Sequence, residues 1–363
     1  MEFWSTWQST LKVDAATNTL VFSKKHKSNM KFLNHVASQG MEEIPNFIWD
    51  TFGSVAVDSR LFAPEELSAA LRFSKLSIGR ERPVTRLYIN SNTLSVQQRL
   101  DLYEIVPRVK DFSISGCVLD AKFFEDLLSS FETAINSLSI ECINICNCYL
   151  TEAQLLCLWK CSKYVRKLFV QSESVTESSL KVLSETLHQI NQDYGCCKLD
   201  TLGMIRCGMN DLCLKEVAKI VPYIQSLHLD LSDKSGIINA GLGSLSDSIV
   251  KERSMPSFSA NAPLDSLHIT FTAREIAYRR LEACIPILKE LSIQFGRLST
   301  DSSKQYTYLH DIAFAINACH GDVRLRTLRV KKEHVEKCKE VMSTLLDADG
   351  NRIDLTVEPW LYF

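Results

Sequence analysis

The chain has 363 residues, a hydrophobic content of 45% and a formal net charge of −2. This length exceeds what one compact core usually holds, so it predicts two domains or an elongated repeat array. The near balance of 41 basic and 43 acidic side chains gives no general attraction to nucleic acid or to an anionic membrane. No apolar run approaches the roughly 18 residues of a spanning helix, and MEFWSTWQST does not read as a secretory signal. Thirteen cysteines without such a signal predict reduced thiols in a cytoplasmic or nuclear protein.

The first 80 residues show little repetition. Residues 9–25 predict two short strands around a polar turn. A helix is predicted near Pro45, with Ile48, Trp49 and Phe52 on one face. Pro64 lies near the first turn of a second predicted helix over residues 63–76.

From residue 84 onward one eleven-residue pattern recurs. VTRLYINSNTL (84–94) and VKDFSISGCVL (109–119) both place apolar residues at the first, fourth and sixth positions and Leu at the eleventh. We call this the repeat pattern. Its fourth and sixth positions are two residues apart, so they face the same side of a strand. Further copies begin at Ile140, Val165, Leu199, Ile224, Leu264, Leu288 and Leu325, with a degenerate copy at Ile353.

The stretches between these copies have helical periodicity. Residues 95–108 place Leu100, Tyr103, Ile105 and Val106 on a predicted helix, and Thr151 is a predicted N-cap for the helix that follows it. The chain therefore alternates a short strand with a helix nine or ten times. A single pair cannot close a core, but stacked copies can. Residues 234–263 predict a loop insertion, most polar over 245–263.

The ninth position of the pattern is where the chain turns out of the strand. A side chain that can bond to the backbone inside the bend suits it. Asn92, Cys117, Cys148 and Cys207 occupy it in four copies.

This pattern resembles the leucine-rich repeat family, in particular its ribonuclease-inhibitor-like branch. The resemblance covers roughly residues 84–357. It implies an α/β fold, a right-handed solenoid with a parallel sheet on the concave side and helices on the convex side. We therefore predict an N-terminal module over residues 1–80 and irregular repeats over 81–363, with the insertion at about 234–263.

A Pro-started apolar helix and a second helix before such repeats resemble the adaptor-docking modules of ubiquitin-ligase substrate receptors of the F-box and cullin-linked type. This resemblance implies that Ile48, Trp49 and Phe52 dock an adaptor. The usual Leu-Pro start is replaced by Ile44-Pro45. The alternative is a solenoid cap, because FGSVAVDSRLF (52–62) also fits the repeat pattern.

In the leucine-rich repeat architecture the residues between the framework positions face the concave side. Aromatic and Arg side chains there have the composition of interface hot spots. Leu231, Phe271 and Phe295 follow the sixth position in three successive copies, and we expect them to form a ridge. The predicted partner-binding residues are Tyr88, Phe169, Ile205, Arg206, His228, Leu231, His268, Phe271, Phe295 and Arg329.

We find no catalytic constellation and predict neither enzymatic activity nor a cofactor. Cys142 and Cys146 should face away from Cys148, so these thiols do not converge on one ion, and no metal site is predicted. His228 and His268 should be neighbours on adjacent strands, which suits recognition better than catalysis. The basic residues of RLRTLRVKK (324–332) suit an acidic protein partner better than nucleic acid.

Two functions remain open. The first is a non-enzymatic receptor that binds a protein on its concave face and presents it to an assembly such as a ubiquitin ligase. The second is a stoichiometric inhibitor or regulatory scaffold of a single protein partner, with no ligase link. Recovery of a cullin adaptor would favour the first.

Overall fold

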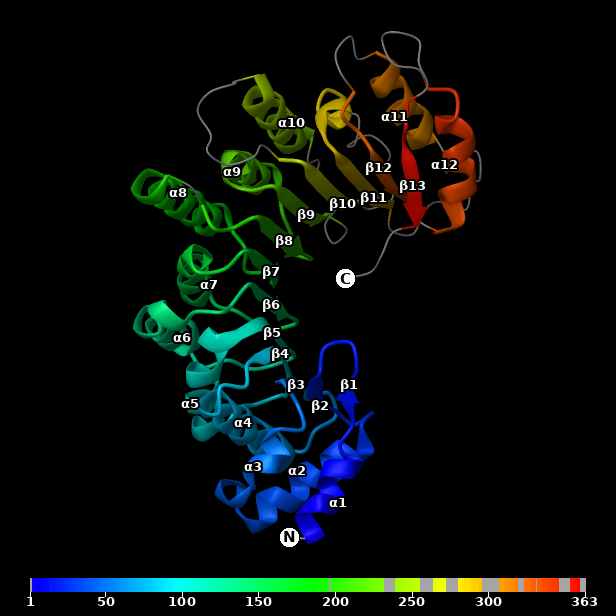
Figure 1. Cartoon of the computed structure of the whole chain (residues 1–363). Helices are drawn as coiled ribbons and strands as arrows, with labels where there is room; N and C mark the ends of the chain where they lie inside the picture. Colours follow the sequence, from blue (N-terminus) through cyan, green and yellow to red (C-terminus); the bar gives the residue numbers. More distant parts are fainter. Residues whose placement is uncertain are drawn as a thin grey trace. The chain divides into compact units, whose positions relative to one another are not determined.

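The computed structural model describes residues 2–195, 197–231, 239–254, 264–271, 280–295, 307–318, 323–330, 332–345 and 353–359. Within these ranges thirteen strands alternate with helices along the chain (Figure 1). The chain divides into two compact units, unit 1 (Met1–Phe169) and unit 2 (Val170–Phe363). The boundary falls inside strand β7 (Lys167–Gln171).

The strands of unit 1 lie side by side in chain order. β1 and β2 pair antiparallel, and each later pair from β2–β3 to β5–β6 is parallel. The pairing of β3 with β2 and β4 agrees with the alternative in which residues 52–62 are a repeat copy. The strands are β1 (Val13–Asp14), β2 (Thr19–Phe22), β3 (Ser54–Asp58), β4 (Val84–Asn90), β5 (Val109–Ser115) and β6 (Cys142–Cys146).

Helices α5 (Val96–Ile105) and α7 (Glu152–Lys160) of unit 1 begin after residues that cap them. Ser95 and Thr151 each accept a hydrogen bond from the backbone N–H three residues on, as an N-cap does. The helices are α1 (Glu2–Thr10), α2 (Lys27–Gln39), α3 (Asn46–Trp49), α4 (Pro64–Gly79), α5 (Val96–Ile105), α6 (Phe123–Thr133) and α7 (Glu152–Lys160). In the stripe predicted for residues 95–108, Ile105 and Val106 are buried and Tyr103 is half-buried, whereas Leu100 is 50% exposed.

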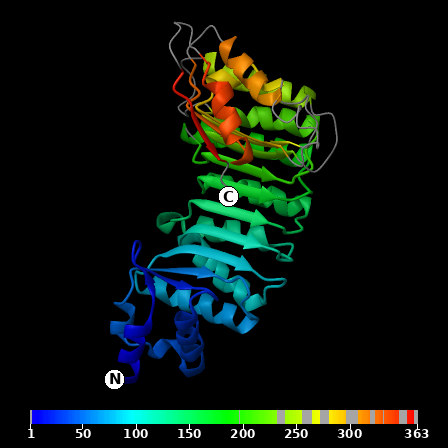
Figure 2. The ribbon, with the colours of Figure 1, turned by 90° about the vertical axis from the view of Figure 1, so that its right-hand side faces the viewer.

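The core of unit 1 lies between the strands and the helices that cover one of their faces (Figure 1). Residues two apart on each strand are buried together, such as Phe112 with Ile114 and Ile143 with Ile145. Figure 2 shows the strands lying side by side. Their other face, which we call the open face, carries no helix in the described part of unit 1.

Unit 2 repeats the same arrangement. Its strands pair parallel from β8 to β13, and from β8 to β12 equivalent positions of the repeat pattern are in register. Its elements are α8 (Glu177–Tyr194), β8 (Thr201–Ile205), α9 (Asp211–Ile220), β9 (Ser226–Leu231), α10 (Asn239–Ser254), β10 (Ser266–Phe271), β11 (Glu290–Phe295), α11 (Thr307–Asn317), β12 (Thr327–Val330), α12 (Val335–Met342) and β13 (Thr356–Pro359).

The predicted loop insertion is wrong where the structure describes it, because residues 239–254 form helix α10. Leu242, Leu245 and Ile249 lie on one helical face and are buried. Gly241 allows α10 to pack closely on α9, since an added Cβ would lie 2.5 Å from Leu214 Cβ. Residues 255–263 lie outside the described ranges.

The ninth-position cysteines are buried and bond to the backbone where the strands end. Cys148 Sγ donates to the carbonyl of Cys146 at 3.3 Å, and Cys207 Sγ donates to that of Ile205 at 3.4 Å. Cys117 Sγ donates to the Ser115 carbonyl at 3.6 Å. The predicted role of these thiols inside the bend is therefore confirmed.

Every copy of the repeat pattern contains a strand, and the parallel pairing is that of the predicted α/β solenoid. Among the described helices, none combines the length and apolar character needed to cross a membrane.

Candidate functional site

The open face of unit 1 carries polar and aromatic side chains in aligned rows. On β4 and β5 the apolar framework residues point to the helices, so the alternate residues point away from them. The strand register places Arg86 beside Asp111 and Tyr88 beside Ser113. Tyr88 lies on this face and is half-buried, and its role in partner binding stays a prediction.

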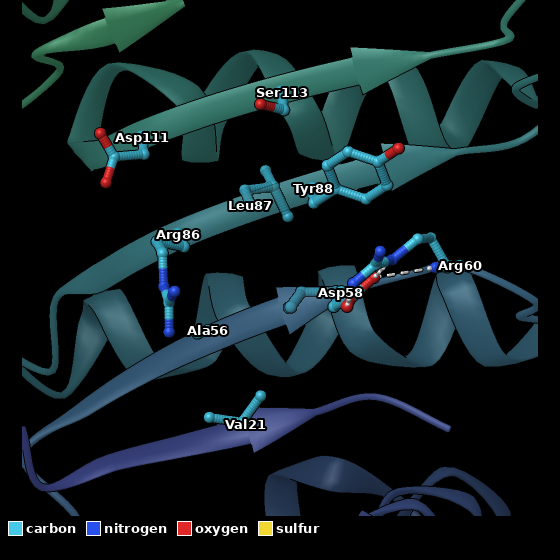
Figure 3. Close-up of a pocket in the computed structure, with 10 residues that line it drawn as sticks. Val21, Ala56, Asp58, Arg60, Arg86, Leu87, Tyr88, Asp111 and Ser113 are labelled. Carbon is cyan, nitrogen blue, oxygen red and sulfur yellow. Dashed lines mark hydrogen bonds and ion pairs between the residues drawn. The ribbon is translucent and has the colours of Figure 1, made fainter. Parts of the chain in front are cut away.

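These rows form the floor of a hollow of about 320 Å³. Figure 3 shows side chains from four neighbouring strands around it. They are Val21, Ala56, Val57, Asp58, Arg60, Arg86, Leu87, Tyr88, Asp111 and Ser113. The hollow combines aliphatic surface with two guanidinium groups, two carboxylates and one phenol.

Arg60 is fixed at one side of this hollow by two contacts. Its Nη2 lies 2.5 Å from Asp58 Oδ2, and its Nε donates to Asp58 Oδ1 at 2.8 Å. The guanidinium carbon also lies 5.4 Å from the centre of the Tyr88 ring. The hydrogen bond from Arg60 lowers the pKa of the Asp58 carboxyl. The site therefore presents a preorganised ion pair next to an aromatic ring.

Asp111 and Arg86 carry the opposite charges on the other side. Partial burial raises the pKa of Asp111, and the carboxylate of Glu141 acts in the same direction. Arg86 opposes this rise and is exposed. A partner that covers the hollow can therefore pair with both signs of charge.

Of the residues that line this hollow, only Tyr88 was predicted. Arg60, Arg86 and Asp111 were missed although the repeat pattern contains the necessary signal. Arg86 lies two residues before Tyr88 and so shares its face, and Arg60 occupies the ninth position of the copy at 52–62. Phe169, the last residue of unit 1, is half-buried on β7.

In unit 2 the predicted concave-side residues His228, His268 and Arg329 lie in one row across neighbouring strands. Gly203, His228, His268, Ser292 and Arg329 occupy matched positions on β8 to β12. The rings of His228 and His268 stack with centroids 4.0 Å apart. Arg329 pairs with Glu290 and donates to Glu358 Oε2 at 3.1 Å.

Part of this row is less accessible than expected. His268 is 6% exposed and Ser292 is 1% exposed. Burial, His228 and Arg329 together lower the pKa of His268 to about 3. The imidazole is therefore neutral near pH 7, and its 3.6 Å approach to Glu290 Oε1 is not an ion pair there.

The predicted apolar ridge differs at Leu231. This side chain is 6% exposed and shares the buried face of β9 with Leu227 and Leu229. Phe271 and Phe295 belong to β10 and β11 and pair in register, but their side chains lie outside the described part of the chain. Ile205 is half-buried and Arg206 is exposed in the bend after β8.

The predicted adaptor-docking residues lie in the core of unit 1. Ile48 and Phe52 are fully buried and Trp49 is 3% exposed. Trp49 stacks on Phe73 of α4 with ring centroids 4.8 Å apart. Helix α3 therefore packs inward with its apolar face, and these three side chains present no surface to an adaptor.

The cysteines of the described residues are free thiols, and no group of three potential metal ligands gathers there. Cys142 and Cys146 are half-buried on the open face, whereas Cys148 is buried in the bend. Burial raises the pKa of Cys142 to about 11 and that of Cys207 to about 12. These thiols are protonated at neutral pH and are poor nucleophiles.

No protein-family model and no curated protein matches this sequence. Among solved structures, the chain is similar to one in the crystal structure of the Rad7 and Elc1 complex in yeast, with 12% identity and a TM-score of 0.45. The match covers 98% of this chain and 81% of that chain. A similarity at this level does not indicate shared partners or a shared activity.

Proposed function

We propose that this protein is a non-enzymatic interaction protein that binds a protein partner on the open face of unit 1. The observation that carries this proposal is the hollow across β2 to β5, where Arg60, Tyr88, Arg86 and Asp111 meet without a covering helix. Tyr and Arg are enriched at the centres of protein interfaces. In a repeat fold the framework residues make the core, so these side chains are available for binding.

Arg60 and Tyr88 form the anchor of the proposed interface. Asp58 and the Tyr88 ring already orient Arg60, so binding costs little side-chain entropy. Arg86 and Asp111 extend the interface with exposed charges that select a complementary partner.

The test is affinity purification with the full chain as bait, followed by titration of the purified partner by calorimetry. Tyr88→Ala and Arg86→Glu should each weaken binding by roughly tenfold or more, as expected for hot-spot residues. Lys31→Glu on α2 is the control, because Lys31 is exposed on an element outside the hollow. Equal affinities of all three variants and the wild type would refute the proposed surface.

A second surface is proposed in unit 2, where His228, Arg329, Ile205 and Arg206 are at least partly accessible. His268 would support His228 by stacking rather than by contact with a partner. The test of this surface is His228→Ala, which should weaken binding to unit 2, and an unchanged affinity would refute it.

A role as a ubiquitin-ligase substrate receptor is a finer proposal. Its support is the order of the chain, in which helices precede the repeats. Ile48, Trp49 and Phe52 cannot serve as the docking side chains, because they are buried. Stoichiometric recovery of a cullin adaptor with the full chain would support this role, whereas recovery of one partner alone would favour the inhibitor or scaffold.

A further inference from the structure

The bends after the strands of unit 1 expose large apolar side chains. Leu61 is 85% exposed, Val118 is 66% exposed and Tyr149 is 92% exposed. Each occupies the tenth position of the repeat pattern, in the copies at 52–62, 109–119 and 140–150. The copies that follow, in unit 2, have Ser174 and Gly208 at this position. A large apolar residue therefore occupies the tenth position in three of the four copies between residues 52 and 150.

The tenth positions lie along one edge of the sheet. Parallel strands bring their carboxyl ends to the same edge, and neighbouring strands are about 4.8 Å apart. Thr93, the tenth residue of the copy at 84–94, forms a bridge with Val118. Gly116 N donates to the Cys146 carbonyl at 3.1 Å, which joins the next two bends. We call Leu61, Val118 and Tyr149 the edge row.

The framework holds the edge row outward. Cys117 and Leu119 on either side of Val118 are buried, as are Cys148 and Leu150 around Tyr149. The intervening side chain must therefore face solvent. Leu61 has a φ of 67°, in the left-handed region that is unfavourable for leucine. Single exposed apolar side chains are common on protein surfaces. Exposed apolar side chains that recur from repeat to repeat are typical of an interaction site.

Helix α5 adds apolar surface in the copy that has Thr93 at the tenth position. Val96 and Leu100, one turn apart on α5, are 64% and 50% exposed. All four consecutive copies from β3 to β6 thus expose an apolar side chain, either in the bend after the strand or in the first turns of the helix that follows.

The Leu61 end of the edge row is basic. A hollow there is lined by Ser23, Lys24, Lys25, Asp58, Arg60, Leu61 and Asn90, so it has three cations and one carboxylate. Lys24 pairs with Glu66 at 2.6 Å and Arg60 pairs with Asp58. Lys25 is exposed and helps to lower the pKa of Asp58. The excess positive charge complements a carboxylate of a binding partner.

We infer that the edge row of unit 1 binds an acidic peptide segment of a protein partner, which places large apolar side chains on Val118 and Tyr149 and a carboxylate beside Lys25. The inference deepens the proposed function by naming the chemistry of the partner. The two surfaces adjoin, because Asp58 and Arg60 line both hollows.

The test selects random dodecapeptides displayed on phage against the full-length chain and titrates the enriched peptide by fluorescence anisotropy. The enriched peptides should carry two or more large apolar residues and a net negative charge. Val118→Asp and Tyr149→Ser should each lower the affinity roughly tenfold, and Lys25→Glu should lower it several-fold. Ile135→Asp is the matched control, because Ile135 is 60% exposed but precedes β6 instead of following a strand. Its affinity should match that of the wild type.

Four results would overturn the inference: no enriched peptide, enrichment of basic peptides, unchanged affinity in Val118→Asp and Tyr149→Ser, or self-association that Val118→Asp abolishes. The last would make a second copy of the chain the occupant. If the affinity is unchanged in Val118→Asp and Tyr149→Ser but lost in Tyr88→Ala, the open-face proposal stays intact. If binding depends on Val118 and Tyr149 but not on Tyr88, the edge-row inference stands and the open-face proposal is refuted.

Discussion

The imidazoles of His228 and His268 stack on the neighbouring strands β9 and β10, with ring centroids 4.0 Å apart and planes 15° from parallel. His268 also faces Glu290 and Arg329. Burial of the ring is the main cause of its lowered pKa, and protonation would also place a new charge beside His228 and Arg329. The pair therefore links the stability of unit 2 to pH.

Acidification should destabilise the protein through His268. The folded-state pKa of about 3 lies below the ordinary histidine value of 6.5, so below pH 6.5 the unfolded state binds more protons. The stabilisation is complete above pH 6.5 and is lost progressively as the pH falls toward 3. At pH 5 the loss is about 2 kcal/mol, from 1.36 kcal/mol for each pH unit.

Urea unfolding of the wild type and of His268→Gln at pH 7 and pH 5 measures how much His268 contributes to the pH dependence of the free energy of unfolding. The variant should lose most of the pH dependence, whereas His310→Gln, an exposed position on α11, should keep it. An identical pH dependence in the wild type and His268→Gln would contradict the assignment.

Two glycines of α10 should respond in opposite directions to the same substitution. In Gly241→Ala the new Cβ would lie 2.5 Å from Leu214 Cβ and 2.9 Å from the Asp211 carbonyl oxygen. The helices must separate, and we expect a loss of about 1–3 kcal/mol. Gly243→Ala meets nothing within 4 Å and should be neutral or stabilise by up to about 1 kcal/mol. Thermal unfolding checks both, and an equal effect of the two would contradict the packing of α10 on α9.

The bend cysteines should resist alkylation in the folded protein. Burial raises the pKa of Cys117 to about 11 and that of Cys207 to about 12, and both side chains are at most 1% exposed. Mass spectrometry after brief iodoacetamide treatment near neutral pH should show much slower modification of these two than of half-buried Cys157. Equal rates before unfolding would show that the bends open readily.

The strands of the repeats were predictable because apolar framework residues two positions apart fit a strand that buries one face. Ile143 with Ile145 and Leu267 with Ile269 predicted β6 and β10 from spacing alone. The same alternation assigns Leu231 to the buried face with Leu229, so its place on a ridge contradicted a signal already in the sequence.

Helix α10 and the inward-facing α3 were harder to predict. The polar residues around Leu245 and Ile249 hid a narrow apolar stripe, and its burial depends on contact with α9. Trp49 was expected to dock an adaptor, but Phe73 covers it, and the sequence does not show that contact. Predicting the hollow at Arg60 would have required the register of β3 against β4. That register shifts between Val55 and Ala56, which the sequence does not show.

The most direct test of open-face binding is photo-crosslinking from position 88. Benzoylphenylalanine replaces Tyr88 in the hollow or, in a matched sample, Lys31 on α2, and cells that express the full chain are irradiated. The account predicts a discrete higher-mass adduct from position 88, lost when Arg86→Glu is added, and no such adduct from position 31. An adduct from position 31 with none from position 88 would contradict it.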